Sequence, residues 1–176
     1  DGTLFKGYSF GAATSVPGEV VFNTAMTGYP ESLTDPSYSG QILVITYPLV
    51  GNYGVPQFTE ENGMLRFFES NRIHIRGLVI SDYSFEYSHW NAVESLGKWL
   101  ADNDVPAVCG VDTRQITKII RERGVMLGKV LVEGTPEPEQ FVDPNRENLV
   151  AQVSTKQAQT YGNGRHRIVL VDCGCK

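Results

Sequence analysis

The three cysteines and three histidines of this sequence are the first candidates for a nucleophile, a general base or a metal ligand. They are Cys109, Cys173, Cys175, His74, His89 and His166. A cysteine nucleophile needs an activating setting and a nearby base, and a structural zinc site needs about four ligands. The histidines are isolated from one another, with no H-E-x-x-H spacing. We therefore interpret them as surface or hydrogen-bonded residues.

The cysteines also have structural interpretations. Cys109 lies inside the apolar segment Val105–Val111, which predicts a buried thiol. Cys173 and Cys175 follow another apolar run, and only His166 is nearby, which is too few ligands for a structural metal site. We therefore predict no metal site and no catalytic residue in this chain.

A different candidate is the loop Thr34–Tyr38 (TDPSY). Its Asp-Pro pair fixes a turn, and Ser37 and Tyr38 then project hydrogen-bonding groups. The loop lies within Gly18–Gly54, where two apolar runs flank residues rich in Gly, Pro, Thr, Ser and Asp. Loops of this length in compact domains are usually functional. The pattern alone leaves open whether the loop binds a ligand or is only a well-made turn.

The elements that must position this loop are a mixture of strands and helices. Strands are predicted over Thr3–Phe10, Glu19–Asn23, Gln41–Tyr47, His74–Ile80, Val105–Val111, Met126–Val132 and Arg167–Asp172, and helices over Thr59–Asn71, Ser88–Asn103 and Thr113–Arg123. The run Gln41–Tyr47 is continuously apolar, as expected of a strand buried on both faces. Strands come first and helices are interspersed singly, which predicts a mixed α/β domain.

Composition narrows the class of protein. The 176 residues are 41% hydrophobic and carry a net charge of −5, with scattered Lys and Arg, which argues against nucleic-acid binding. No apolar run approaches the ~20 residues of a membrane span. An odd, low cysteine count argues against a disulfide framework and for a reducing compartment.

Three segments are expected along the chain. Residues 1–153 are predicted to form one domain, and residues 154–166, which are polar with two glycines, a linker. Residues 167–176 contain an apolar run followed by Gly174, which is typical of the first strand of a second α/β domain. The chain begins without Met, so we expect it to be a fragment or a processed form.

Several long motifs carry a family resemblance. GEVVFNTAMTGYPESLTDPSYSGQILVITYPLVGNYG, VDTRQITKIIRERGVMLGK and VDCGCK, in this order, resemble the amino-terminal domain of the small, glutamine-hydrolysing chain of carbamoyl-phosphate synthase. FFESNRIHIRGLVISDYSFEYSHWNAVESLGKWL is most similar to eukaryotic, pyrimidine-pathway forms fused into a multifunctional enzyme. The resemblance implies a swivelling β/β/α-type domain, followed by a linker and the first strand of a class I glutamine amidotransferase domain.

The resemblance also implies a reaction and a division of labour. In the family a Cys-His-Glu triad hydrolyses glutamine, and ATP, bicarbonate and ammonia give carbamoyl phosphate in a separate synthase part that uses Mg, as the first step of pyrimidine or arginine biosynthesis. The triad belongs after Lys176, so this fragment alone is expected to be inactive and to hold no cofactor. The serine of the TDPSY motif contacts glutamine in the family, which makes Ser37 the implied glutamine-binding residue.

The implied partners are the amidotransferase domain and the large synthase chain or region. The implied location is cytoplasmic, or mitochondrial for an arginine- or urea-type form. An alternative is a non-catalytic scaffold or interaction domain with no role in glutamine hydrolysis. A G-x-C-x-G elbow and a His-x-Glu after Lys176 would favour the enzyme, whereas loss of that cysteine would favour a scaffold or an ammonia-dependent relative.

Overall fold

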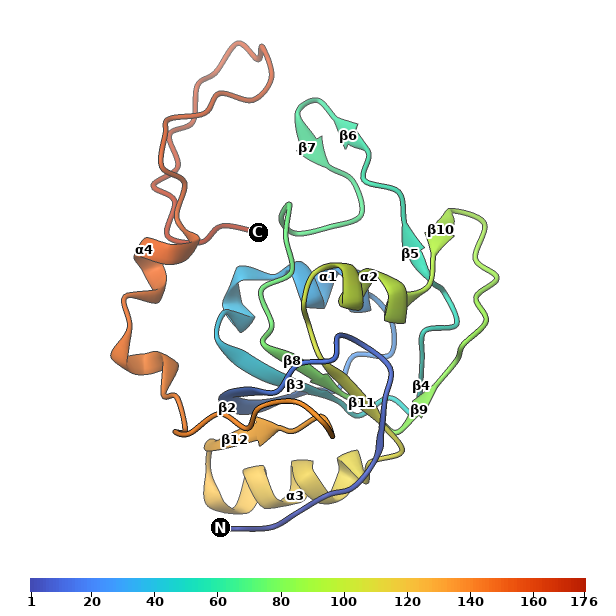
Figure 1. Ribbon diagram of the computed structural model, residues 1–176. Coiled ribbons are helices and arrows are strands. Elements are labelled where there is room, and N and C mark those ends of the chain that lie inside the picture. Colours follow the sequence, from blue (N-terminus) through green and yellow to red (C-terminus); the bar gives the residue numbers. More distant parts are fainter.

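The computed structural model describes residues 1–176 and centres on a six-stranded sheet (Figure 1). In spatial order the strands are β1 (Tyr8–Ser9), β11 (Ala107–Cys109), β8 (Gly77–Val79), β3 (Gln41–Ile45), β2 (Val16–Asn23) and β12 (Met126–Val130). The four central strands are parallel, and each edge strand is antiparallel to its neighbour. The chain is therefore a mixed α/β fold, as predicted.

Helices cover both faces of this sheet (Figure 1). α1 (Tyr29–Thr34) and α2 (Leu96–Asp102) lie on one face, and α3 (Thr113–Arg123) lies on the other. The remaining elements are η1 (Pro36–Tyr38), η2 (Pro144–Arg146), α4 (Leu149–Val153) and the strand pairs β4 (Leu49–Val50) with β9 (Asp82–Tyr83), β5 (Val55–Pro56) with β10 (Ala92–Glu94), and β6 (Glu60–Glu61) with β7 (Met64–Leu65). None of the helices has the length and hydrophobicity needed to cross a bilayer.

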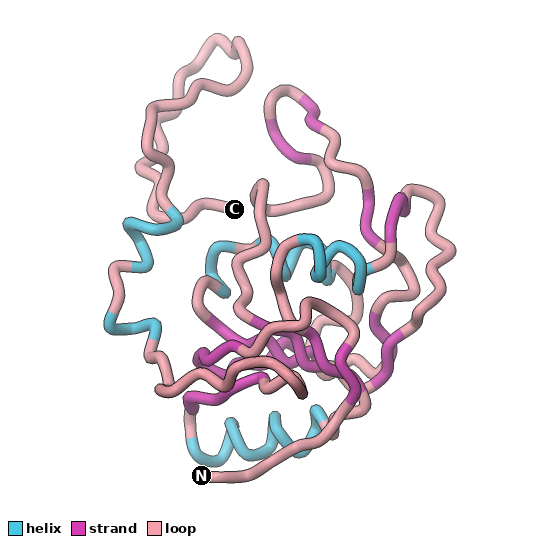
Figure 2. The backbone as a smooth tube through the Cα atoms, in the orientation of Figure 1, coloured by secondary structure: helices cyan, strands magenta, loops and turns pink.

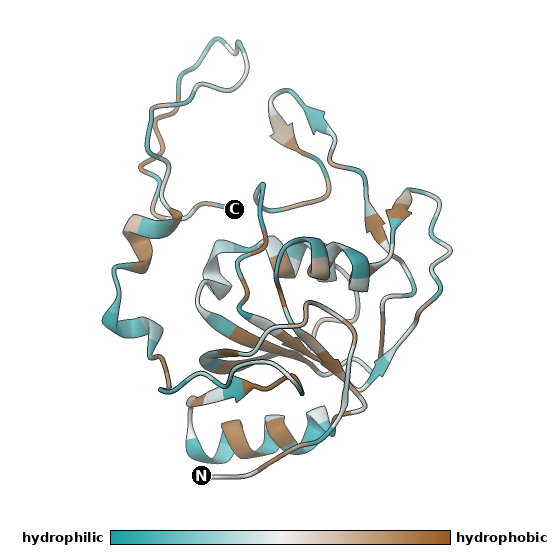
Figure 3. Ribbon diagram, in the orientation of Figure 1, coloured by the Kyte–Doolittle hydropathy of each residue, from teal (hydrophilic) through white to brown (hydrophobic).

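Strand β3 is buried on both faces, as its apolar run predicts. Leu43 and Ile45 belong to the larger core under α1 and α2, whereas Ile42 and Val44 belong to the smaller core against α3. All four side chains are at most 4% exposed. Figure 3 shows these central strands in brown between the helical layers. One strand thus joins the two cores and holds the end of the preceding loop in place.

One predicted helix is wrong. The segment Thr59–Asn71 contains the hairpin β6–β7 and no helix. Asn62 and Gly63, which connect the two strands, have φ values of 56° and 79°. Positive φ at both central residues is what a tight hairpin turn requires, and an Asn-Gly pair adopts it with little strain. The preference of Asn62-Gly63 for a hairpin turn therefore prevails over the helix-capping preference of Thr59 and Glu60.

A second predicted helix, Ser88–Asn103, is much shorter than expected. Only α2 is helical, because Ala92–Glu94 pairs with β5 as strand β10. Ser95 caps the helix in place of Ser88, and its hydroxyl accepts a hydrogen bond from the backbone N–H of Lys98. A competing strand partner therefore moved the helix start by two turns.

The third predicted helix, α3, is confirmed together with its ends. The Asp112 carboxylate accepts a hydrogen bond from the backbone N–H of Gln115, and Gly124 follows the last turn with φ of 84°. Most predicted strands also form, generally with shorter bounds, although β2 begins three residues earlier than predicted. The first, expected over Thr3–Phe10, is reduced to β1.

The last predicted strand, Arg167–Asp172, does not form. Its backbone has no neighbouring strand to bond with, and its apolar side chains are exposed. Residues 154–166 form neither helix nor strand. After α4 the chain makes a long excursion away from the sheet and then returns toward it at its end (Figure 2).

Candidate functional site

Ser37 lies in the connection between α1 and β3, in residues 35–38, which we call the serine arm. Asp35 ends α1 and begins η1, and its carboxylate accepts the backbone N–H of Ser37 at 2.8 Å. Pro36 has no N–H and a fixed φ, which suits the first position of this turn. Asp35 and Pro36 are buried, whereas Ser37 is exposed. The arm therefore presents Ser37 outward, as the turn pattern predicted, whereas Tyr38, which was also expected to project, is half-buried and packs against the larger core.

The preceding residue, Thr34, fixes the arm from inside. Its side chain is 0% exposed. The Thr34 hydroxyl donates to the carbonyl of Pro30 at 2.8 Å and accepts the backbone N–H of Glu69 at 3.0 Å. The hydroxyl of Ser70 donates to the carbonyl of Thr34 at 2.7 Å. Buried polar groups that are fully bonded in this way are costly to disturb, so the arm is a rigid element.

His74 extends the same network behind the arm. Its ring Nε2 lies 3.0 Å from the Ser70 hydroxyl, and its backbone N–H donates to the carbonyl of Leu33 at 2.9 Å. Burial, and then the neighbouring Arg72, hold the pKa of His74 below its ordinary value of 6.5, so the ring is neutral at neutral pH. The interpretation of His74 as a hydrogen-bonded histidine is confirmed.

Tyr38 fixes the other end of the arm. The side-chain amide of Asn23 donates to the Tyr38 hydroxyl and to the Ser32 hydroxyl, both at 3.2 Å. Because Asn23 ends β2 and Ser32 lies on α1, one amide joins strand, helix and arm. Burial raises the pKa of the Tyr38 phenol, which stays protonated at neutral pH.

The arm also contacts the C-terminal end of the chain. The Lys176 ammonium donates to the Asp35 carboxylate at 2.6 Å, across 141 residues of sequence. Burial acts to raise the pKa of Asp35, but hydrogen bonds from Lys176 and from the backbone and side chain of Ser37 bring it below its ordinary value. The same contact raises the pKa of Lys176. Both groups are therefore charged at neutral pH.

Gly174 lies in the same contact. Its φ is 98°, and a Cβ at this position would lie 2.5 Å from the Val153 side chain and 3.6 Å from that of Pro36. A larger residue would force the end of the chain away from the arm. The glycine therefore permits the approach that brings Lys176 to Asp35.

The cysteines take no part in this arrangement. Cys109 is 8% exposed within β11, and burial raises the pKa of its thiol, so the prediction of a buried structural cysteine is confirmed. Cys173 and Cys175 are exposed and unpaired. His89, expected in a helical turn, lies in the loop before β10 and contacts Asn91. No group of three or more His, Cys, Asp or Glu side chains is arranged to hold a metal ion.

A further candidate, absent from the sequence-based predictions, is the pattern G-x-S-x-G at Gly7–Gly11 (GYSFG). A nucleophile elbow requires a strand-to-helix turn, whereas Ser9 lies in the edge strand β1. A Cβ at Gly7 would lie 2.3 Å from the carbonyl oxygen of Cys109, and one at Gly11 2.5 Å from that of Val105. The two glycines therefore serve close strand packing, and the pattern marks no nucleophile.

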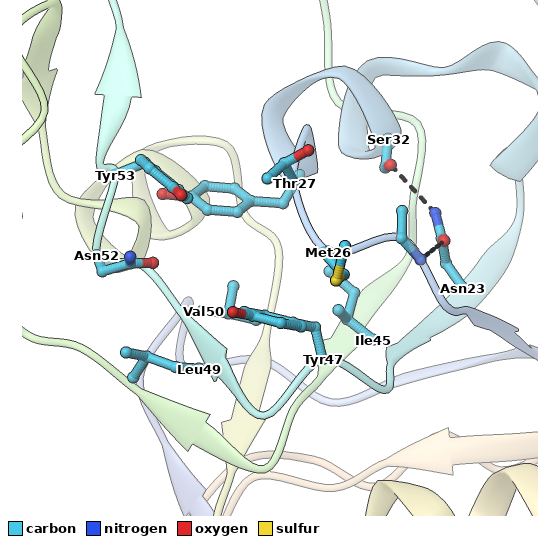
Figure 4. Close-up of a pocket in the computed structure, with 12 residues that line it drawn as sticks. Asn23, Met26, Thr27, Ser32, Ile45, Tyr47, Leu49, Val50, Asn52 and Tyr53 are labelled. Carbon is cyan, nitrogen blue, oxygen red and sulfur yellow. Dashed lines mark hydrogen bonds between the residues drawn. The ribbon is translucent and has the colours of Figure 1, made fainter.

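A small hollow opens on another side of Asn23 (Figure 4). Eight of its twelve lining residues are hydrophobic, among them Tyr47 and Tyr53. The side-chain oxygen of Asn52 is buried there without a hydrogen-bond partner. Ser37 is not among the lining residues, so this hollow and the serine arm are separate features.

The sequence singled out Ser37 as a candidate but did not reveal that Thr34, Tyr38 and Lys176 hold the arm. Thr34 was noted only as the first residue of the turn, although a small polar residue directly before an Asp-Pro turn is a usable signal for an anchor. Lys176 carries no local signal, because its partner is so distant along the chain.

Known proteins of one family are similar to this chain. The family described as carbamoyl-phosphate synthase small chain, CPSase domain, matches residues 1–130. The chain is 55% identical over 179 residues to the mitochondrial carbamoyl-phosphate synthase (ammonia) of Homo sapiens, which covers 100% of this chain and 12% of that protein.

Two further relatives differ in their organisation. The arginine-specific carbamoyl phosphate synthase small chain of Eremothecium gossypii is 50% identical over 182 residues, covering 99% of this chain and 45% of the relative. The multifunctional protein CAD of Squalus acanthias is 51% identical over 179 residues, covering 100% of this chain and 8% of the relative. This chain thus spans less than half the length of each relative. Similarity of this degree along the whole sequence shows that the chain belongs to the carbamoyl-phosphate synthase small-chain family.

Proposed function

We propose that this chain is the amino-terminal part of the glutamine-hydrolysing chain of a carbamoyl-phosphate synthase, and that Ser37 contacts the glutamine. The observation that carries the proposal is the exposure of Ser37 on an arm that Thr34 and Tyr38 hold rigidly. A rigid scaffold with an exposed hydrogen-bonding group is suited to orienting a polar substrate.

The contact between Asp35 and Lys176 supports a site shared between two domains. In this proposal residues 1–153 form the swivelling β/β/α-type domain, residues 154–166 the linker, and residues 167–176 the opening of the amidotransferase domain. The exposed apolar run supports the last assignment, because burying a side chain such as Leu170 contributes about 1.5–3 kcal/mol. The arm would then reach into a cleft at the domain boundary, where binding sites often form.

The proposed role of Ser37 is to position substrate, without bond breaking. A Cys-His-Glu triad in the amidotransferase domain would hydrolyse glutamine, and ATP with Mg in the synthase part would use the ammonia. Cys109 is buried and Cys173 has no base hydrogen-bonded to it, so the 176-residue chain alone is expected to show no glutaminase activity. The proposed partners are the amidotransferase domain and the large synthase chain or region, in the cytoplasm or the mitochondrion, and in pyrimidine or arginine biosynthesis.

The substitution Ser37→Trp, made in a carbamoyl-phosphate synthase that contains this chain, tests the role of Ser37. An indole would fill the space of a substrate that contacts Ser37, so we expect glutamine-driven synthesis to fall by roughly a hundredfold. Synthesis driven by saturating ammonium should be unchanged. Ser88→Trp, on an exposed loop, is the matched control and should alter neither activity. Loss of both activities together, or of neither, contradicts the assigned role.

A second candidate function has one observation in its favour, which is that the human relative is named as an ammonia-type synthase. In such a protein the chain would be a scaffold that docks other parts of the enzyme, and Ser37 would contact no substrate. The unaltered protein would then show no glutamine-driven synthesis, and Ser37→Trp would leave ammonia-driven synthesis unchanged. The glutamine assay of the unaltered protein therefore separates the two candidates before any variant is made.

A further inference from the structure

A second hollow, distinct from that in Figure 4, lies beside the serine arm. Ser39 and Gly40, which directly follow the arm, form part of its wall. Residues of segment 72–76 line the hollow, together with residues between Val142 and Gln152, which come from η2, α4 and the chain around them. Only three of its eleven lining residues are hydrophobic. The lining is therefore mostly polar, unlike that of the apolar hollow around Asn52.

Two arginines line this hollow. Arg72 and Arg76 lie four residues apart on the segment that leads into β8. Neither forms an ion pair. The Arg72 guanidinium donates to the carbonyl of Gln152 at 3.0 Å, and both residues line the hollow. The backbone N–H of Arg76 donates to the carbonyl of Gln41 at 2.7 Å, which ties the segment to β3.

The hollow has an excess of positive charge. Its one acidic side chain, Glu147, already accepts a hydrogen bond from the side-chain amide of Gln152 at 2.7 Å. His74, between the two arginines, is neutral at neutral pH because burial lowers its pKa. Two positive charges and one negative charge therefore line the hollow, in a chain whose net charge is −5.

Gly40 shapes the wall of this hollow. Its φ is 80°, and a Cβ there would lie 2.7 Å from the Pro144 side chain. The glycine thus lets the segment around η2 approach the end of the serine arm. The hollow is a product of this close packing between segments that are distant in sequence.

We propose that this hollow binds a small phosphate-class oxyanion. A guanidinium offers forked N–H donors that match the oxygens of phosphate, and two such groups can hold one tetrahedral anion from two sides. A phosphate group carries about 1.5 to 2 negative charges at neutral pH, so it is attracted by the excess positive charge of the hollow. The Ser39 hydroxyl supplies an additional donor on the wall.

Inorganic phosphate added to the isotope-labelled 176-residue chain, at constant ionic strength, tests the proposal by nuclear magnetic resonance. We expect saturable shifts confined to residues 39–40, 72–76 and 142–152. The double variant Arg72→Gln/Arg76→Gln should bind phosphate at least about tenfold more weakly, because it loses the charged donors. Both arginines are exposed, so the variant should keep its fold, which its spectrum reports directly.

The matched control is Arg114→Gln/Arg121→Gln, which removes two exposed arginines of α3 and should bind phosphate as the unaltered chain does. Acetate at the same ionic strength separates phosphate recognition from carboxylate binding and from simple screening. Unsaturable shifts, equal binding by the Arg72/Arg76 variant, or equal binding of acetate would each overturn the proposal. Because the readout is binding to this chain, the result is independent of any role of Ser37 with glutamine.

Discussion

Two apolar runs of similar composition have opposite structures in this molecule. Gln41–Tyr47 (QILVITY) contains the buried strand β3, and Arg167–Asp172 (RIVLVD) is exposed and irregular. Ile42 is 2% exposed, whereas Ile168 is 93% exposed. β3 has parallel neighbours on both edges and a helix over each face, and the second run has neither. Hydrophobic composition therefore produces a strand only where neighbours accept its hydrogen bonds and cover its side chains.

The serine arm and the C-terminal end of the chain, which meet at the candidate site, also differ in how firmly they are held. The serine arm is fixed through buried hydrogen bonds at Thr34 and through Tyr38. The end of the chain reaches the arm through the ion pair of Lys176 with Asp35, and the lysine side chain is 53% exposed. One partner in this contact is part of the core structure, and the other is tethered to it.

The largest expected difference comes from removing one leucine from each run. Leu43→Ala should lower the free energy of unfolding by about 2–5 kcal/mol, because it leaves a cavity beside α1. Leu170→Ala should change it by less than about 0.5 kcal/mol, because that side chain is already exposed. Urea denaturation followed by circular dichroism measures both. Equal losses in the two variants would remove the distinction between the runs.

A smaller loss is expected at the anchor of the serine arm. Thr34→Val keeps the shape of the side chain but removes the hydroxyl that bonds Pro30 and Glu69, at a cost of about 1–3 kcal/mol. Thr160→Val, in the exposed segment after α4, is the control and should be near neutral. Denaturant midpoints compare the two. A neutral Thr34→Val would mean that the arm does not depend on this anchor.

The smallest expected effect comes from removing the ion pair between Lys176 and Asp35, which we call the tether. Lys176→Met should lower stability by less than about 1 kcal/mol, because the lysine is largely exposed. It should also move the titration of Asp35. In the unaltered chain the Asp35 pKa lies below 3.8, so the pair stabilises this contact above that pH and its contribution is lost as the pH falls through the lowered pKa.

The carboxyl resonance of Asp35 reports this titration. Its midpoint should rise in Lys176→Met and stay low in the control variant Lys118→Met, whose lysine is exposed on α3. At the alkaline end, the raised pKa of Lys176 keeps the pair intact until the pH exceeds 10.5. An unchanged Asp35 midpoint in Lys176→Met would show that the tether is absent in solution.

Local pattern was enough to predict some parts of this structure. β3 follows from its apolar run, α3 from its periodicity and capping residues, and the outward serine from its Asp-Pro turn. The hairpin β6–β7 was misread because acidic residues after Thr59 resemble a helix start, although Asn62-Gly63 is the stronger signal. The error arose because this segment contains both a helix-start signal and a turn signal, and the turn forms.

Other features depend on partners that no local pattern reveals. Thr34 is bonded by Glu69, 35 residues away, and Asp35 is bonded by Lys176. α2 starts later than predicted because the residues before it form β10, which pairs with the distant strand β5. The strand expected over Arg167–Asp172 does not form, because no strand of this chain pairs with it. Long-range pairing, which propensity does not encode, accounts for each difference.

The order of strands in the sheet has a consequence for how the polypeptide is made. Tyr8 pairs with Cys109, and the opposite edge is completed by β12, which ends at Val130. A nascent chain emerging from the ribosome must therefore keep its first strand unpaired until most of the sheet has been synthesised, and loop closure over such separations is slow. The family model matches residues 1–130, so it covers the shortest chain that can finish the sheet.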